Sequence, residues 1–185
     1  MYIDKIKTDR LIIRKHLEKD FEDFLSMNSD LEVMRFIGNE NTSLNSNKNY
    51  YISWFKELLS NSKINETEIL AVLEKETNHY IGFNGIFIPP DHNIYELAFR
   101  FQKENWSKGY ATESSIAILK KWFNYKPNSK VLADYHPDNI GSEKILQNLG
   151  FIKVDNKYDE GTDEYLTVAE LSNDRFVKQL TKRCS

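Results

Sequence analysis

The sequence predicts a mixed α/β (α+β) fold in which helices flank a largely antiparallel sheet of about seven strands. Residues 94–101 alternate apolar and polar side chains, as expected of a strand with one buried face. Residues 111–124 instead place Ile116, Leu119 and Phe123 at helical spacing. Strands and helices follow one another without the strict alternation of a parallel βαβ protein, which favours an antiparallel sheet.

The remaining strands are predicted from short apolar or β-branched runs bounded by turn residues. They comprise residues 10–15, 69–73, 80–88, 131–135, 151–158 and 165–171. Apolar residues three or four positions apart predict further helices. These comprise residues 20–27, 31–36, 50–59, 139–149 and 174–182, with Gly150 as a left-handed cap after the fourth. Residues 39–49 are rich in Asn, Ser and Thr and are predicted to form a loop.

Length and composition indicate a single domain spanning residues 1–185. The net charge of −3 provides no basic excess for phosphate backbones, so we expect no nucleic acid partner. We expect no membrane interaction, because no stretch approaches the roughly 20 apolar residues of a membrane span and the N-terminus lacks the apolar run of a signal peptide. A cytoplasmic location follows by default, and a monomer and a homodimer are both left open.

Cysteine and histidine residues show no pattern of a disulfide or a metal site. Cys184 is the only cysteine, and we expect it to be a free thiol near the chain terminus. His16, His79 and His92 are scattered without metal-ligand spacing. We therefore predict no metal and expect these histidines at the surface or in loops.

The segment WSKGYATE, residues 106–113, lies between a predicted strand and a predicted helix. A helix N-terminus presents unpaired N–H groups and the positive end of the helix dipole, which together favour an anion such as phosphate. Gly109 lets the backbone approach such an anion, Ala111 is small, and Thr112 and Lys108 add a hydroxyl and a positive charge. The same residues also fit an ordinary turn between a strand and a helix.

A second segment begins a later helix with Asn139 and Ser142. Asparagine is strongly preferred as a helix N-cap, which by itself explains Asn139. Ser142 either supports that cap or points its hydroxyl into a cleft.

Four runs in this order resemble a known family: TDRLIIR (8–14), EVMRFIG (32–38), ELAFRF with NWSKGYATE (96–113) and PDNIGSEKILQNLGF (137–151). Together they resemble the RimJ/RimL-like branch of the GCN5-related N-acetyltransferase (GNAT) superfamily, which includes enzymes that acetylate N-terminal amines of ribosomal proteins. The resemblance extends from about residue 8 to about residue 171. It implies an acetyltransferase that uses acetyl-CoA as co-substrate and an amine as acceptor.

The resemblance also implies a V-shaped split between the strands that end at Phe101 and Tyr135, in which acetyl-CoA lies. The strand at Phe99, Arg100 and Phe101 is then expected to bind the pantetheine arm through its backbone. The pyrophosphate is expected at the backbone amides of Ser107, Lys108, Gly109, Tyr110, Ala111 and Thr112. Asn139 is expected to hydrogen-bond the pantetheine arm, and Ser142 to lie near the thioester sulfur.

This chain departs from the superfamily pattern at two positions. Trp106 replaces the Arg or Gln that opens the phosphate-binding motif, and Ser142 stands where many members offer a tyrosine as general acid. An amine must lose its proton to attack a thioester, so a base is required. Glu96, acting through water, is the first candidate base, and His136, with an ordinary pKa near neutrality, is the second.

Alternatives to an acetyltransferase are a non-catalytic acyl-CoA sensor, which needs the phosphate loop but no base, and a structural protein without cofactor. The acceptor is left open among a protein N-terminus, a polyamine, an aminoglycoside-like drug and another small amine. Residues 39–62, the loop near Pro89 and residues 159–163 are expected to select it, because loops carry specificity. One cluster of acids either attracts a cationic acceptor or forms a solvated loop. It comprises Asp155, Asp159, Glu160, Asp163 and Glu164.

Overall fold

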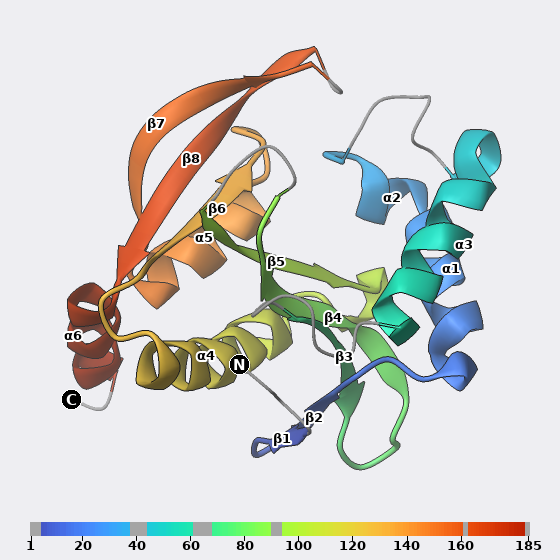
Figure 1. Cartoon of the computed structure of the whole chain (residues 1–185), viewed down its shortest axis with the longest axis horizontal. Helices are drawn as coiled ribbons and strands as arrows, with labels where there is room; N and C mark the ends of the chain where they lie inside the picture. Colours follow the sequence, from blue (N-terminus) through green and yellow to red (C-terminus); the bar gives the residue numbers. More distant parts are fainter. Residues whose placement is uncertain (1–4, 38–43, 61–67, 90–93, 161–162, 184–185) are drawn as a thin grey trace.

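The protein is described by a computed structural model that covers residues 5–37, 44–60, 68–89, 94–160 and 163–183, with the side chains of residues 44–47 and 68 left aside. Its strands form one sheet of eight, in the order β1-β2-β3-β4-β5-β6-β8-β7 (Figure 1). The strands are β1 (Lys5–Lys7), β2 (Leu11–Arg14), β3 (Glu68–Glu74), β4 (Tyr80–Phe87), β5 (Tyr95–Phe101), β6 (Lys130–Tyr135), β7 (Ile152–Asp159) and β8 (Glu164–Ser172). All neighbours are antiparallel except β5 and β6.

The predicted α/β fold is confirmed, with one strand more than expected. The additional strand is β1, which is too short to show a period in the sequence and buries only Ile6. It is held by pairing with β2, which is a tertiary effect.

Helices lie on both faces of the sheet. Figure 1 shows α1, α2 and α3 gathered on one side of the molecule and α4, α5 and α6 on the other. Their bounds are α1 (Phe21–Ser29), α2 (Leu31–Met34), α3 (Leu44–Ser60), α4 (Tyr110–Tyr125), α5 (Ile140–Leu149) and α6 (Asn173–Arg183), with short 3-10 turns η1 (Glu18–Asp20) and η3 (Lys103–Asn105). No helix in the described ranges is long and apolar enough to cross a membrane.

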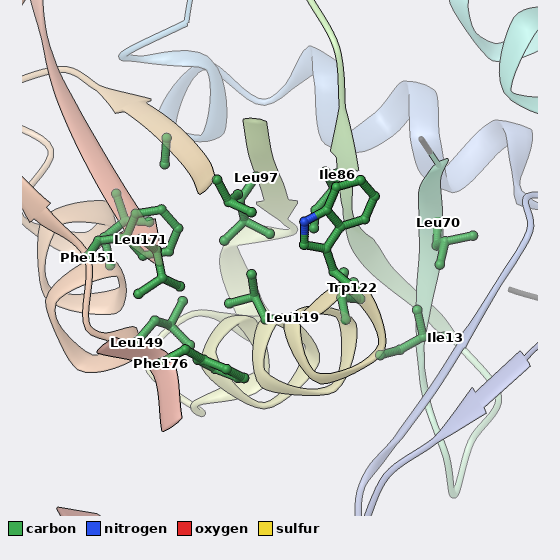
Figure 2. Packing of buried hydrophobic residues seen from close by; sticks show 14 of the residues in the cluster. Ile13, Leu70, Ile86, Leu97, Leu119, Trp122, Leu149, Phe151, Leu171 and Phe176 are labelled. Atoms are coloured by element: carbon green, nitrogen blue, oxygen red, sulfur yellow. The ribbon is translucent and has the colours of Figure 1, made fainter. Parts of the chain in front are cut away.

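The larger core fills the space between the sheet and helices α4, α5 and α6. Trp122 and Leu119 of α4 are completely buried there against Leu97 and Ile86 of the sheet (Figure 2). Burial of each such side chain contributes roughly 1.5–3 kcal/mol, so this contact fixes α4 on the sheet. Gly150, with φ of +96°, ends α5 in the predicted left-handed conformation.

A second core lies on the opposite face, where α1 and α3 pack on the sheet. Tyr51 and Phe55 of α3 are buried against Phe24 of α1 and Phe83 of β4. The predicted loop over residues 39–49 is wrong in its second half, because α3 begins at Leu44, whereas residues 39–43 lie outside the described ranges. Asn and Ser have weak helix propensity, but a helix that buries an aromatic stripe gains more from packing than local propensity removes.

His16 corrects the expectation that the scattered histidines lie at the surface. Its side chain is 3% exposed and is enclosed by the rings of Phe24, Phe55 and Tyr80, whereas His79 is exposed as expected. Burial lowers the pKa of His16 from 6.5 to about 4, because the imidazolium form cannot be hydrated there. His92 lies outside the described residues, as does Cys184.

Replacement of His16 by leucine should reduce the acid sensitivity of the fold. Between pH 6.5 and about 4 the unfolded chain binds a proton at His16 that the folded chain does not, so stability present above pH 6.5 is lost as the pH falls. The loss is on the order of 3 kcal/mol. Urea unfolding at pH 7 and pH 4.5 should show a smaller difference for His16→Leu than for the wild type. The exposed control His79→Gln should match the wild type, and an unchanged pH dependence in His16→Leu would contradict the assignment.

Candidate functional site between two separating strands

A cavity of about 180 Å³ opens where β5 and β6 separate. These strands pair only at Tyr95 with Val131 and at Glu96 with Leu132. Beyond these positions the two strands form no further pairs, so their facing backbone edges border the cavity. Its lining comprises Phe87, Glu96, Leu97, Ala98, Phe99, Ala133, Asp134, Ser142 and Leu146. The split expected between the strands that end at Phe101 and Tyr135 is therefore present.

Glu96 and Ser142 enter this cavity from different elements. Glu96 lies on β5 and is 7% exposed, and it points to the sheet face opposite Leu97, which is packed in the α4 core. Ser142 lies in the first turn of α5, on the same side as α4. The cavity thus connects a buried carboxylate on one face of the sheet with a hydroxyl on the other.

The loop before α4 ends in a backbone conformation suited to an anion. Gly109 is the N-cap of α4 with φ of +80°, and Ser107 also has a positive φ of +59°. Backbone of this kind can direct successive N–H groups into one concavity. The first hydrogen bond of the helix joins the Glu113 N–H to the Gly109 carbonyl, so the N–H groups of Tyr110, Ala111 and Thr112 precede the helical ladder.

Asn139 caps α5, as the sequence predicted. Its side-chain oxygen accepts a hydrogen bond of 3.1 Å from the Ser142 N–H. The cap therefore fixes the first turn of α5, and with it the position of the Ser142 hydroxyl at the cavity.

Residues 10–152 match the family model of the acetyltransferase (GNAT) domain. The chain belongs to the GNAT acetyltransferase family. Among GNAT relatives, the uncharacterized N-acetyltransferase YnaD of Bacillus subtilis (strain 168) is 27% identical over 166 residues, which cover 86% of this chain and 93% of that protein.

Solved GNAT structures share the fold. An acetyltransferase (GNAT family) from Bacillus anthracis has a TM-score of 0.71 at 21% identity, covering 92% of this chain and 99% of that chain. RimJ from Mycobacterium smegmatis, in complex with CoA-disulfide, has a TM-score of 0.70 at 10% identity, covering 94% and 88%. The GNAT resemblance predicted from the sequence is thereby confirmed, and the likeness to RimJ is one of fold.

The GNAT loop before α4 is held by a brace from the connection between β1 and β2 that sequence reasoning missed. Arg10 donates from Nη1 to the Lys108 carbonyl at 2.9 Å and from Nε to the Glu113 carboxylate at 2.7 Å. Thr8 and the Arg10 backbone N–H donate to the other carboxylate oxygen, at 2.6 and 3.0 Å. Burial alone raises the pKa of Glu113, but these hydrogen bonds outweigh it and lower the pKa. Thr8 and Arg10 belong to the run TDRLIIR, which pointed to the family resemblance but carried no signal for this contact.

Two further contacts fix the same loop. Trp106, which replaces the Arg or Gln of the GNAT pattern, donates from its indole nitrogen to the Phe101 carbonyl at 2.8 Å. The Tyr110 hydroxyl donates to Glu74 at 2.9 Å, which raises the pKa of Tyr110. Trp106 therefore closes the turn between β5 and the loop.

His136 lies beside the split but outside the residues that line the cavity. Its Nδ1 accepts a hydrogen bond of 3.0 Å from the Asp138 N–H, and its Nε2 is 2.9 Å from the Glu164 carboxylate. The ring stacks on Phe36 with 5.0 Å between centroids. His136 thus joins the segment after α2 to the β7–β8 hairpin, and both ring nitrogens already have partners. This contact gives Glu164, one of the predicted acidic cluster, a defined partner.

Replacement of Glu113 by alanine should loosen the loop before α4. The change leaves Thr8, the Arg10 side chain and the Arg10 N–H without their shared acceptor. We expect the free energy of unfolding to fall by only about 1–2 kcal/mol, because Arg10 is half exposed and water weakens its ion pair. Amide hydrogen exchange at residues 107–112 should accelerate in Glu113→Ala. The matched control is Glu104→Ala, an exposed carboxylate of η3. Equal exchange in the two variants would show that the brace does not hold the loop.

Proposed function

We propose that this GNAT protein transfers the acetyl group of acetyl-CoA to an amine acceptor by direct attack on the thioester. The observation that carries the proposal is the cavity between β5 and β6, which has the α4 N-terminus beyond one strand and the α5 N-terminus beyond the other. The single sheet that runs through all eight strands supports treating residues 1–185 as one catalytic domain.

The residues around the split fit acetyl-CoA. A Cβ at Gly109 would meet only the Arg10 Nη2 atom, at 3.4 Å, so space for an anion lies against the backbone. The amides of residues 107–112 would hold the pyrophosphate, with Lys108 adding positive charge. The backbone of Phe99, Arg100 and Phe101 is the edge along which the pantetheine arm would lie, because β6 does not pair with it there. The side-chain oxygen of Asn139 already accepts the cap hydrogen bond. A contact between Asn139 and the pantetheine arm would therefore use its other polar groups.

Glu96 is the base that the geometry favours. It lines the cavity, whereas His136 does not and uses both ring nitrogens elsewhere. A buried carboxylate that reaches the amine through one water removes the proton that an ammonium group carries at neutral pH. The acceptor then enters from the face of the sheet covered by α1 and α3, because Glu96 points to that face.

The reaction balances with the residues of the split. The ammonium group first loses a proton through water to Glu96. The neutral amine nitrogen then attacks the thioester carbonyl carbon. The developing oxyanion accepts a hydrogen bond from an unpaired backbone N–H of β5. When the carbon–sulfur bond breaks, the attacking nitrogen passes its second proton to the leaving CoA thiolate, and the Ser142 hydroxyl is placed to donate a hydrogen bond to that sulfur. The products are the acetylated amine and CoA.

Replacement of Gly109 by glutamate should abolish binding of acetyl-CoA. The new carboxylate would repel the pyrophosphate, and a side chain is strained at this positive φ. Isothermal titration calorimetry should detect no binding by Gly109→Glu, and Gly109→Ala, which carries the strain without the charge, should bind more weakly than the wild type. Unchanged affinity in Gly109→Glu would exclude the loop as the phosphate site.

Replacement of Glu96 by glutamine should lower kcat by about 100-fold to 10,000-fold while acetyl-CoA affinity changes little. The variant loses the proton acceptor but keeps the shape of the cavity, and its rate should no longer respond to ionisation of that carboxylate. Thiol release against pH measures this. Glu170→Gln, a strand glutamate that pairs with Lys130 at the surface, is the matched control. A normal rate in Glu96→Gln would transfer the role of base to His136.

A panel of amines tests the function as a whole. Thiol release from acetyl-CoA should require one class among N-terminal peptides, polyamines, aminoglycosides and small amino compounds. Among the solved structures is one described as a ribosomal-protein-S5-alanine acetyltransferase from Vibrio fischeri, so an alanine N-terminal peptide belongs in the panel. Binding of acetyl-CoA without release for any amine would favour the non-catalytic sensor.

A further inference from the structure

Arg100 is a largely buried cation for which the described part of the chain supplies no carboxylate. Its Nη1 donates to the side-chain oxygen of Asn28, and Tyr51 shares a second hydrogen bond with it. Both partners are neutral, and the Nε atom is buried without a partner. Charges removed from water are almost always paired, because an unpaired one costs several kcal/mol.

A second arginine on the same face shows how this fold pairs such a charge when its role is structural. Arg14 makes two hydrogen bonds, of 2.6 and 2.8 Å, to the carboxylate of Asp20, and Asp20 in turn accepts from the Leu17 N–H. Arg100 has no such acid among the described residues. The largest electrostatic influences on it come from the hydroxyls of Tyr51, Tyr80 and Tyr50, and burial lowers its pKa.

The surroundings hold the guanidinium in place. Its carbon lies 5.3 Å from the ring centre of Phe83 and 5.9 Å from that of Trp54, so two aromatic rings flank it. The Asn28 side chain donates to the Phe24 carbonyl at 2.6 Å, which turns its oxygen toward Arg100. The guanidinium group of Arg100 is therefore held in one orientation, while no carboxylate among the described residues neutralises its charge.

The position of Arg100 relates it to the acceptor. Glu96, Ala98 and Arg100 project from the same face of β5, and the first two line the cavity. Along a strand these residues follow at intervals of about 7 Å, so Arg100 lies roughly 13 Å from Glu96. The backbone of Arg100 borders the split, while its side chain faces the side of α1 and α3 from which we expect the amine.

We propose that Arg100 binds an anionic group, a carboxylate or a phosphate, on the amine that accepts the acetyl group. The inference rests on the proposed function for the identity of the acceptor as an amine. The acceptor is then a small molecule or a short peptide that carries both an amine and an anionic group. The two groups must be far enough apart for the amine to reach Glu96 while the anionic group reaches Arg100. A polyamine is then disfavoured, because a second positive charge would approach Arg100.

Matched pairs of acceptors test the proposal. ω-Amino acids from glycine to 6-aminohexanoate are compared with their carboxamides, and phosphoethanolamine is compared with ethanolamine, by thiol release from acetyl-CoA. The wild type should use the anionic member of at least one pair more efficiently. Arg100→Gln should lower kcat/KM for that member by roughly tenfold to a hundredfold more than for the neutral member. The kcat/KM of Arg100→Lys for the anionic member should lie between those of the wild type and Arg100→Gln, because lysine keeps the positive charge but not the planar guanidinium group.

The control is Lys130→Gln, which removes an exposed cation from β6 and should change neither member. Equal use of both members by the wild type, or an equal loss for both in Arg100→Gln, would overturn the inference while the acetyltransferase proposal stands. If no amine releases thiol, the proposed function fails, and thermal shift with the same compounds still decides the inference. An increase in Tm that the anionic members cause in the wild type and not in Arg100→Gln supports it, and the absence of that increase overturns it.

Stability distinguishes a ligand-binding arginine from a structural one. Replacement of Arg100 by methionine should leave the Tm of the unliganded protein equal to or above that of the wild type, because an unpaired buried charge is removed. Replacement of Arg14 by methionine should lower the Tm, because the buried carboxylate of Asp20 loses the cation that pairs with it. A comparable loss in Arg100→Met would show that Arg100 is neutralised within the chain and would overturn the proposal.

Discussion

β5 and β6 hydrogen-bond to each other only at their first residues, and the backbone edges left unpaired beyond Glu96 and Leu132 are the feature around which the site is arranged. Unpaired backbone groups inside a protein need partners, so a split of this kind is stable only where a ligand or water enters it. The helices that follow the two strands, α4 and α5, then begin close to the split. The loop that we propose to bind phosphate and the capped N-terminus of α5 thereby follow the two strands that border one cavity.

The two faces of the sheet are used differently. The face covered by α4, α5 and α6 is apolar and fixed by Trp122 and Leu119, and the loop before α4 gains a separate brace from Arg10 and Glu113. The face covered by α1 and α3 mixes aromatic rings with buried polar groups, among them His16 and Arg100. The first arrangement fixes the loop that we propose to bind the cofactor. The second supplies charge and hydrogen-bonding groups near the place where an acceptor would enter.

Predictions from the sequence succeeded where a local pattern decides the outcome. The alternation of residues 94–101 gave β5, the glycine after α5 gave its left-handed cap, and Asn139 gave the N-cap of α5. They failed where partners distant in sequence decide. Residues 44–49 became helical because α3 packs on α1, and His16 became buried because three aromatic rings from separate elements enclose it. Residue type and spacing carry no information on such partners.

By itself the sequence determined the order and type of most elements, the glycine loop before α4 and the family to which four motifs pointed. These features follow from side-chain periodicity and backbone preference, which act within a few residues. Only the tertiary structure decided that Glu96 and Ser142 meet at one cavity, that Arg10 holds Lys108 and Glu113, and that the partly buried Arg100 has no carboxylate partner among the described residues. The physical reason is that each of these depends on which strands pair and where they separate, and those distances are fixed by packing of the whole sheet.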